Sequence, residues 1–394
     1  MISVEEALAY VLDLFEPLNI EDVPIANAMG RVLARDIAAS HNQPPFASSA
    51  MDGYAVQNHD IATKATLTVI GESAAGLRFN GSVGTGQAVR IFTGAPVPDG
   101  ADRILIQEDC TRKDDIITVS DNIDTKPYIR PAGGDFSIGD TVSAPLKLGT
   151  NEISLLAAMN IGTVPVRRKP IIALVPTGDE LVYPGTALGL DQICSSNNLG
   201  LKAMIEAAGG EARLLPIARD NEAALRTVLE LCEGADAIVT MGGASVGDHD
   251  LIGKMAQGTD MDTSFYKVAM RPGKPLMAGR YNGIPLIGLP GNPVSSIVCG
   301  HIFMRPALNA MLGFNKQALP REIATLTQDI NINGPRAHYM RAIENQTEAG
   351  LTCSLFDRQD SSLLSILAQA NLLMVRPPND PAKKAGDKVD VIRI

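Results

Sequence analysis

The chain has 394 residues, of which 45% are hydrophobic and 20% charged, with a formal net charge of −10. This length predicts roughly two to four domains. The absence of tryptophan, the aromatic content of 4% and the acidic balance argue against a nucleic-acid-binding protein, which needs stacking side chains and a basic face. They do not exclude an anionic small molecule, because lysine and arginine can gather locally around it.

The cysteines and the N-terminus predict the compartment. The five cysteines form no C-x-x-C pair and have no zinc-like spacing to histidine, which argues against a zinc site and suits a reducing compartment. The stretch Met1–Leu8 has neither the basic nor the apolar segment of a signal peptide, and no run approaches the ~20 apolar residues that span a bilayer. We therefore expect a cytoplasmic protein with no membrane partner.

The N-terminal region is predicted to be helical. Ser3 and Glu6 make a capping box, and a helix over 4–15 is expected to stop near Pro17. A second short helix is predicted over 26–34. The first helix has one apolar face, made by Val4, Leu8, Val11, Leu12 and Phe15.

From His41 to Arg130 the pattern changes to short alternating runs, such as Leu67–Ile70 and Asp102–Gln107, separated by turn residues. This is typical of an all-β insert. The alternative is a set of long loops on a larger domain. The turn signals are Pro44-Pro45, Asp52-Gly53, Pro96 and Pro98–Gly100.

Strand and helix patterns alternate from Pro170 to about Leu312, which predicts a three-layer α/β domain with a mostly parallel sheet. The expected strands are 171–175, 213–218, 236–241 and 264–270, and the expected helices are 197–208, 221–233, 250–256 and 293–311. Short strands then return over 313–394, at 323–326, 338–344, 351–355, 372–375 and 390–394, as in a small β-barrel or sandwich.

The predicted fold is therefore multidomain, α/β plus β. Its parts are an N-terminal helical or mixed domain (1–40 and 134–166), a β-rich insert (41–133), the α/β domain (167–312) and a C-terminal β-barrel-like domain (313–394).

Two loops at the ends of predicted parallel strands carry most of the functional signal, Thr177–Glu180 and Gly242–Asp250. Such loops build the ligand crevice of an open α/β sheet. Both combine glycines, which let a backbone approach a phosphate, with carboxylates that can hold a divalent cation. With the downstream loops Arg271–Pro275 and Gly288–Pro293, they predict a phosphorylated ligand that is handled with a metal ion.

Each acidic position also has a purely structural interpretation. Asp179 and Glu180 can form a helix N-cap pair, since acidic residues favour that position. Asp220 precedes the predicted helix 221–233 and can cap it, but it also lies at a strand end on the expected ligand edge. For Asp220 the cap and ligand roles stay equally open.

The loop Gly242–Gly247 has three glycines and a serine directly after a strand, so its N–H groups can face an anion. The alternative is a tight strand-to-helix turn. Asp248 and Asp250 can reach the same cation as Glu180, whereas His249 is interpreted as a bystander.

Lys267, Arg271 and Lys274 surround a strand exit and a Pro-Gly turn, where several positive groups can meet one oxyanion. A solvated basic face is the alternative, but the flanking residues are apolar or turn-forming. In the insert, Ser48–Val56 and Thr93–Pro96 are by themselves typical of hairpin turns.

Six segments in this order together resemble the molybdopterin molybdenumtransferases, the molybdenum insertase family that includes the C-terminal half of gephyrin. They are Pro45–Val56, Phe92–Pro98, Thr177–Leu181, Gly242–Asp250, Arg271–Pro275 and Gly288–Ser295. The resemblance covers essentially the whole chain. It implies an elongated, L-shaped, four-domain homodimer, whose α/β domain is similar to the molybdopterin adenylyltransferase that acts one step earlier.

The resemblance also implies residue roles. It places adenylylated molybdopterin and Mg²⁺ at Thr177, Gly178, Asp179, Glu180, Asp220, Gly242, Gly243, Ser245, Asp248 and Asp250, with Glu180, Asp220 and Asp250 as the metal ligands. The basic group that faces the pyrophosphate and molybdate is Lys267, Arg271 and Lys274. Further substrate contacts are Pro290, Gly291, Asn292, Ser295, Arg341 and Ser361. Positions near or across the subunit interface are Asp52, Thr93 and Asp135, and Asp52 is assigned with the catalytic group.

The chain departs from the family pattern at three of these places. Arg271 stands where lysine is common, which keeps the charge and changes the donor geometry. Gly134 precedes Asp135 where an acidic residue is usual, and Asp360 precedes Ser361 where a small neutral residue is common.

The resemblance implies an enzyme that inserts molybdenum from molybdate into adenylylated molybdopterin, with Mg²⁺, and releases AMP. Its implied partners include the adenylyltransferase and acceptor apo-molybdoenzymes. Two rival functions stay open: a scaffold that kept the fold, as gephyrin also clusters receptors, and a molybdopterin adenylyltransferase. Intact charged loops argue against the first, and the β domains argue against the second.

Overall fold

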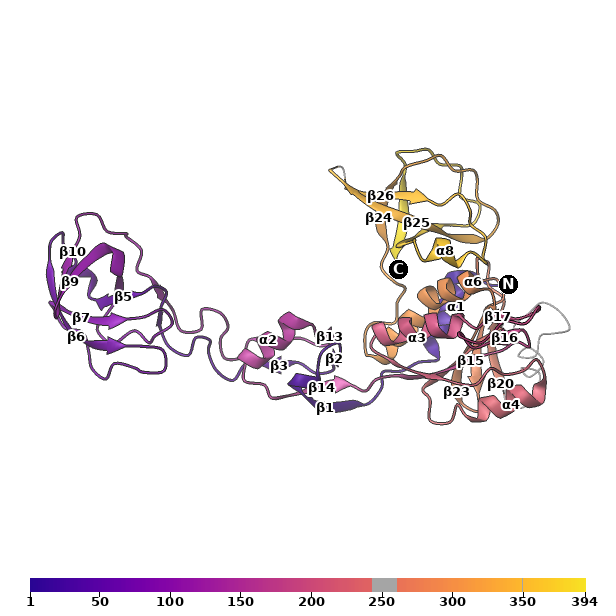
Figure 1. Ribbon diagram of the computed structural model, residues 1–394, viewed down its shortest axis with the longest axis horizontal. Helices are drawn as coiled ribbons and strands as arrows, with labels where there is room; N and C mark the ends of the chain where they lie inside the picture. The colour runs from indigo at the N-terminus through magenta and orange to yellow at the C-terminus, as the bar shows by residue number, and fades with distance from the viewer. Residues whose placement is uncertain (243–260, 349) are drawn as a thin grey trace. The chain divides into compact units, whose positions relative to one another are not determined.

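The computed structural model describes residues 1–242, 261–348 and 350–394 (Figure 1). The chain forms two compact units. The first contains Met1–Val23, Gly30–Ala34 and Pro165–Ile394, and the second contains Pro24–Met29 and Arg35–Val164. In the described part of the chain no helix is long and apolar enough to cross a membrane.

The centre of the first unit is a six-stranded sheet in the order β18-β15-β19-β23-β22-β20. The first four strands are parallel, and β22 and β20 add antiparallel pairs at one side. The mostly parallel sheet is therefore confirmed. The bounds are β15 Ile171–Pro176, β18 Glu211–Leu214, β19 Ala237–Met241, β20 Met261–Tyr266, β22 Met277–Tyr281 and β23 Ile284–Leu289.

Helices cover both faces of this sheet, which makes the three predicted layers. Alternate residues of β15 face opposite sides: Leu174 packs in one apolar cluster with α1, α3 and α7, whereas Val175 packs in another with α4. The helices are α1 Val4–Asp13, α3 Asn197–Ala207, α4 Glu222–Glu230 and α6 Pro293–Cys299, the last continued by a π-helical turn, Gly300–Met304, and by α7, Arg305–Met311.

Two element predictions in the first part of the chain need comment. The Ser3–Glu6 capping box is present at the start of α1. The predicted helix over 26–34 is wrong, because a 3₁₀ turn, Ile25–Asn27, is followed by the short strand β2, Val32–Leu33. Gly30 has a φ of 74°, which ends helical structure there, and the two apolar residues are buried as a strand.

The C-terminal region is a closed five-stranded barrel, as predicted. Its strands follow the order β25-β26-β24-β28-β27, and β27 pairs back with β25. A sixth strand, β21 (Met270–Arg271), pairs in parallel with the start of β25. The barrel strands are β24 Glu322–Leu326, β25 Ala337–Thr347, β26 Gly350–Leu355, β27 Leu372–Arg376 and β28 Lys388–Arg393, with the short helix α8 at Leu364–Leu367.

The second unit contains the β-rich insert, a six-stranded sheet in the order β8-β5-β7-β6-β10-β9. Apolar clusters on both faces of this sheet show that it is a packed domain and not a set of loops. Its strands are β5 Gly53–Val56, β6 Thr66–Ser73, β7 Gln87–Ile91, β8 Arg103–Ile106, β9 Cys110–Lys113 and β10 Ile116–Val119.

The remaining short elements are 3₁₀ turns at Asn58–Asp60 and Gln107–Asp109, helix α2 Thr150–Ala158, and strands β1 Ile20–Pro24, β3 Ile37–Ala38, β4 Ser48–Ser49, β11 Ile129–Arg130, β12 Thr141–Val142, β13 Leu146–Lys147, β14 Thr163–Arg167, β16 Leu181–Val182 and β17 Ile193–Cys194.

Candidate active site

A cavity of about 540 Å³ lies at the carboxyl ends of β15, β19 and β23. This is the sheet edge at which an open α/β fold binds its ligand. Eight of the residues predicted from the sequence line this cavity. They are Thr177, Gly178, Glu180, Asp220, Gly242, Pro290, Gly291 and Asn292.

Thr177 begins the first loop and is held firmly. Its backbone N–H and its hydroxyl both donate to the carbonyl oxygen of Met241, at 3.0 and 3.3 Å, and its side chain is buried. The backbone N–H of Gly178 donates to Ala218, which joins the first loop to the chain before Asp220. These hydrogen bonds fix the first loop both to the end of β19 and to the segment before Asp220.

The structure separates the acidic residues of these loops. Glu180 lines the cavity and leads into the short strand β16, so no helix follows that it could cap. Asp179 points elsewhere: its carboxylate accepts the backbone N–H of Asp220 at 3.2 Å, and its carbonyl oxygen accepts from Arg219 at 2.9 Å. The N-cap interpretation of the Asp179–Glu180 pair is wrong.

The cap interpretation of Asp220 is also wrong. Helix α4 begins at Glu222, and its N-cap is Asn221, whose side-chain oxygen accepts the N–H of Ala224 at 2.9 Å. Asp220 instead lines the cavity that Glu180 also lines. Two carboxylates of the predicted metal set therefore share one cavity.

Gly242 shows why the second loop requires glycine. Its φ is 95°, and a Cβ atom there would lie 2.7 Å from both the carbonyl oxygen and the hydroxyl of Thr177. The two loops touch at this point, so a side chain would push them apart. The other predicted residues of this loop, Gly243, Ser245, Asp248 and Asp250, lie outside the described residues, as does the predicted helix 250–256.

The fourth loop connects the cavity to the barrel. The side-chain amide of Asn292 donates to the hydroxyl of Ser361 at 3.3 Å, and the backbone N–H of Val294 donates to the carbonyl oxygen of Ser361 at 3.1 Å. Two predicted substrate contacts from different parts of the sequence are thus adjacent. Ser295 follows in the first turn of α6 and is buried.

Arg341 lies on barrel strand β25 and is only 2% exposed. Its Nε donates to the side-chain oxygen of Gln359 at 3.3 Å, so it holds the loop that carries Ser361. Asp360, next to Ser361, accepts the hydroxyl and the backbone N–H of Ser362, and these hydrogen bonds lower the pKa of its carboxyl group.

The three predicted basic residues are placed differently from one another. None of them is among the described residues that line the cavity, although Pro275, next to Lys274, is. Lys274 is exposed, and the Lys267 ammonium lies 5.0 Å from the ring centre of Tyr266. Arg271 pairs with the barrel strand β25. Their joint action on one oxyanion stays a prediction.

Sequence reasoning did not find one wall of the cavity. Cys194, Ser195, Ser196 and Asn197 line it, and the side-chain amide of Asn197 donates to the carbonyl oxygen of Gly291 at 2.7 Å. The sequence pattern predicts only that a helix begins at Asn197, and it assigns no role to the residues before it. Small polar residues before a helix on the ligand edge are the signal that could have indicated it.

The second unit holds the other predicted residues. The Asp52 carboxylate accepts both the backbone N–H and the hydroxyl of Thr93, at 2.7 and 2.8 Å, and these hydrogen bonds lower its pKa. Asp135 lines a separate cavity of about 540 Å³ within this unit, with Phe46 and Gly94 among its neighbours. Asp52 and Thr93 are therefore adjacent, whereas their functional roles stay predictions.

Comparison with known proteins assigns the family. The chain matches the model of the MoeA N-terminal region (domain I and II) over residues 2–160, a probable molybdopterin binding domain over 173–310 and the MoeA C-terminal region (domain IV) over 324–394. It is 30% identical to a molybdopterin molybdenumtransferase of Staphylococcus epidermidis, with 99% of this chain and 95% of the relative aligned. The chain belongs to the molybdopterin molybdenumtransferase family.

Other relatives agree with this assignment. The molybdopterin molybdenumtransferase 2 of Mycobacterium tuberculosis is 32% identical over 99% of both chains. The crystal structure of a molybdopterin biosynthesis protein from Pyrococcus horikosii is 29% identical, covers 100% of this chain and 99% of its own, and superposes with a TM-score of 0.83. The chain is thus a transferase of molybdenum cofactor biosynthesis with the MoeA fold.

Proposed function

We propose that this transferase inserts molybdenum from molybdate into adenylylated molybdopterin, depends on Mg²⁺ and releases AMP, acting in the cytoplasm as a homodimer. The observation that supports this best is the cavity at the strand ends, which Glu180, Asp220 and Asn292 line together with the glycines Gly178 and Gly242. Such a cavity suits a phosphorylated ligand that binds with a cation.

The described residues fit a magnesium site of the kind that a substrate completes. Glu180 and Asp220 line the same cavity, but no group of three metal-binding side chains occurs among the described residues. Magnesium is usually held by one or two protein carboxylates together with substrate phosphates and water. Glu180 and Asp220 would hold it, and the ion would offset charge on the pyrophosphate during its cleavage.

Other residues of the chain would shape the cavity and donate hydrogen bonds to the substrate. Thr177 and Gly242 fix the floor of the cavity, and Asn292 with Ser361 supplies neutral donors toward an oxyanion. In the reaction, water adds to the phosphoanhydride, one phosphate stays on molybdopterin and AMP leaves. The two dithiolene sulfurs bond to molybdenum, and a displaced oxo ligand of molybdate leaves with the two thiol protons as water.

Incubation of the purified protein with adenylylated molybdopterin, Mg²⁺ and molybdate tests the proposal. We expect AMP release together with reconstitution of an apo-molybdoenzyme, and neither without Mg²⁺. A parallel reaction with ATP and metal-free molybdopterin should give no adenylylated product. Adenylylation in that reaction, without molybdenum insertion in the first, would replace the proposal with the adenylyltransferase function.

A further inference from the structure

Arg90 of the β-rich insert is held between two aromatic rings. It lies on β7 as the cross-strand partner of Tyr54 on β5. The central carbon of its guanidinium is 5.2 Å from the ring centre of Tyr54 and 4.7 Å from that of Phe92, which follows β7. Cation–π contacts with two rings restrict the movement of the guanidinium. Its N–H donors are therefore directed at fixed positions.

These donors reach the turn that carries Asp52. One terminal nitrogen of Arg90 donates to the carbonyl oxygen of Gly53 at 3.0 Å, and the other donates to the side-chain oxygen of Gln107 at 3.0 Å. The backbone N–H of Gln107 donates in turn to the carbonyl oxygen of Asp52 at 3.1 Å. Arg90 thus fixes two successive carbonyl groups of the turn, one directly and one through Gln107.

Arg90 also borders the residue that binds the Asp52 carboxylate. Thr93, directly after Phe92, donates its backbone N–H and its hydroxyl to that carboxylate at 2.7 and 2.8 Å. Arg90 contacts Phe92 on this side and Gly53 on the other. It therefore joins the two chain segments that together orient the Asp52 carboxylate.

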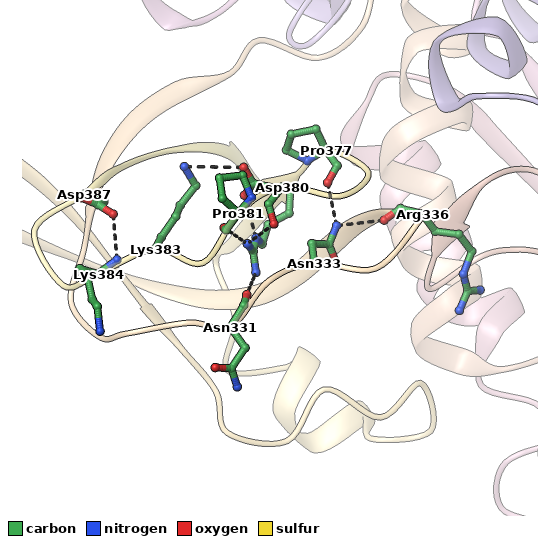
Figure 2. A network of polar contacts seen from close by, with 10 residues as sticks. Asn331, Asn333, Arg336, Pro377, Asp380, Pro381, Lys383, Lys384 and Asp387 are labelled. Carbon is green, nitrogen blue, oxygen red and sulfur yellow. Dashed lines mark hydrogen bonds and ion pairs between the residues drawn. The ribbon is translucent and has the colours of Figure 1, made fainter.

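Arg376 of the barrel provides a comparison, because its contacts are those of an arginine with a structural role. It is 4% exposed, and its Nε donates to the Asp380 carboxylate at 2.9 Å. Its other nitrogens donate to the carbonyl oxygens of Asn331 and Pro381, at 2.6 and 2.7 Å, and these partners converge in Figure 2. None of them is a predicted site residue. Arg90 forms no such ion pair within the described residues, and its donors hold the turn of a predicted site residue.

Several ionisable groups surround Arg90 and Asp52. Glu72 is the partner of Arg90 on β6, and Glu108 accepts from the side-chain amide of Gln107 at 3.2 Å. The thiol of Cys110 stays neutral, because burial raises its pKa to about 11. The hydrogen bonds from Thr93 lower the pKa of Asp52, and the charge of Arg90 lowers it further. Loss of that charge should therefore raise the pKa of Asp52.

We propose that Arg90 is a positioning residue, which holds the Asp52 carboxylate in the orientation that the reaction needs. This rests on the proposed function, because it takes Asp52 as part of the site. Gly53 and Gln107 belong to different chain segments, and a planar guanidinium can donate to both at once. A lysine at this position would keep the charge and lose the paired donors.

The rate of AMP release by the full-length protein tests this role. Arg90→Gln should lower kcat by about tenfold or more and leave KM for adenylylated molybdopterin within about twofold. Arg90→Lys should lose nearly as much, because its ammonium cannot replace the forked donors. In an Asp52→Ala background, Arg90→Gln should cause no further loss, since no carboxylate is left to position.

Arg112→Gln is the matched control. Arg112 is an exposed arginine of the same insert, and its side chain contacts the carbonyl oxygen of Asp114 and the carboxylate of Asp115. Its replacement should leave kcat and KM within about twofold of the wild type. Thermal unfolding of each variant measures how much of the protein is folded, so that a loss of stability is not counted as a loss of positioning.

Carbon-13 NMR of the Asp52 carboxyl group against pH tests the contact without the reaction. The signal is assigned by its loss in Asp52→Asn. The pKa of Asp52 should be higher in Arg90→Gln than in the wild type, whereas Arg90→Lys, which keeps the charge, should stay close to the wild type. Arg112→Gln should not change it.

The outcomes separate this role from the proposed function. Wild-type kcat in folded Arg90→Gln or Arg90→Lys, or a loss that multiplies with that of Asp52→Ala, would overturn the positioning role. An unchanged pKa of Asp52 in Arg90→Gln would also overturn it. If Arg90→Gln does not fold, Arg90→Lys decides the kinetic test. If the wild type releases no AMP but the pKa rises in Arg90→Gln, the proposed function falls and the control of Asp52 by Arg90 stands.

Discussion

The cavity of the α/β domain and the end of the barrel carry opposite charges. Glu180 and Asp220 line the cavity, and no lysine or arginine is among its described lining residues. The barrel end instead presents Arg271 and Arg336 without carboxylate partners in the described part of the chain. A cation with its phosphates suits the first region, and a free oxyanion suits the second. The hydrogen bond from Asn292 to Ser361 joins the cavity to a loop of the barrel.

The largest effect is expected at the acidic region. Glu180→Gln keeps the shape of the side chain and removes its charge, so Mg²⁺-dependent AMP release should fall by roughly 100-fold or more. Asp191→Asn, at an exposed carboxylate of the loop that returns to the cavity, should stay close to wild type. Equal loss in both variants, or none in the first, would remove Glu180 from the metal site.

A smaller loss is expected from the basic loop. Lys274→Ala should weaken apparent molybdate affinity by about 10- to 100-fold, because a charge-assisted hydrogen bond contributes roughly 1.5–3 kcal/mol. High molybdate should partly restore the rate. The dependence of AMP release on molybdate concentration measures this, and an unchanged dependence in a folded variant would show that Lys274 does not contact the anion.

Mixed dimers test whether Asp52 of one subunit completes the site that contains Lys274 of the other subunit. Asp52→Ala and Lys274→Ala should each be impaired alone. Co-expressed in equal amounts, they should pair randomly, so that half of the dimers have one intact site, and activity should recover to about a quarter of wild type. No recovery, with random pairing verified by mass, would place each site within one subunit.

The smallest effect is expected at Asn221, the residue next to Asp220. Asn221→Ala removes the cap of α4 and should lower the free energy of unfolding by about 1 kcal/mol with little change in AMP release. Asp220→Asn should do the reverse, losing Mg²⁺-dependent activity at unchanged stability. Thermal unfolding, followed by circular dichroism, measures the stability of both variants, and parallel assays measure their AMP release. Lost stability in Asp220→Asn with lost activity in Asn221→Ala would contradict these assignments.

Local sequence patterns predict the structure correctly wherever the conformation of a segment depends mainly on its own residues. The capping box predicts the start of α1, the strand-end glycines predict the cavity loops, and five short strands predict the barrel. The prediction of a helix over 26–34 is wrong because Gly30 adopts a positive φ, which a short helical periodicity in the sequence does not reveal. Asp220 could not be interpreted, because a shift of one residue in the start of α4 decides between cap and cavity.

The sequence by itself determined which residues can carry the chemistry and that α/β and β domains follow one another. Only the tertiary structure decided which of them meet. It joined Asn292 to Ser361, brought Ser195–Asn197 into the cavity wall and placed Arg271 beside His338. The physical reason is that strand pairing and domain packing join residues far apart in the chain, and no periodicity within one segment records such a contact.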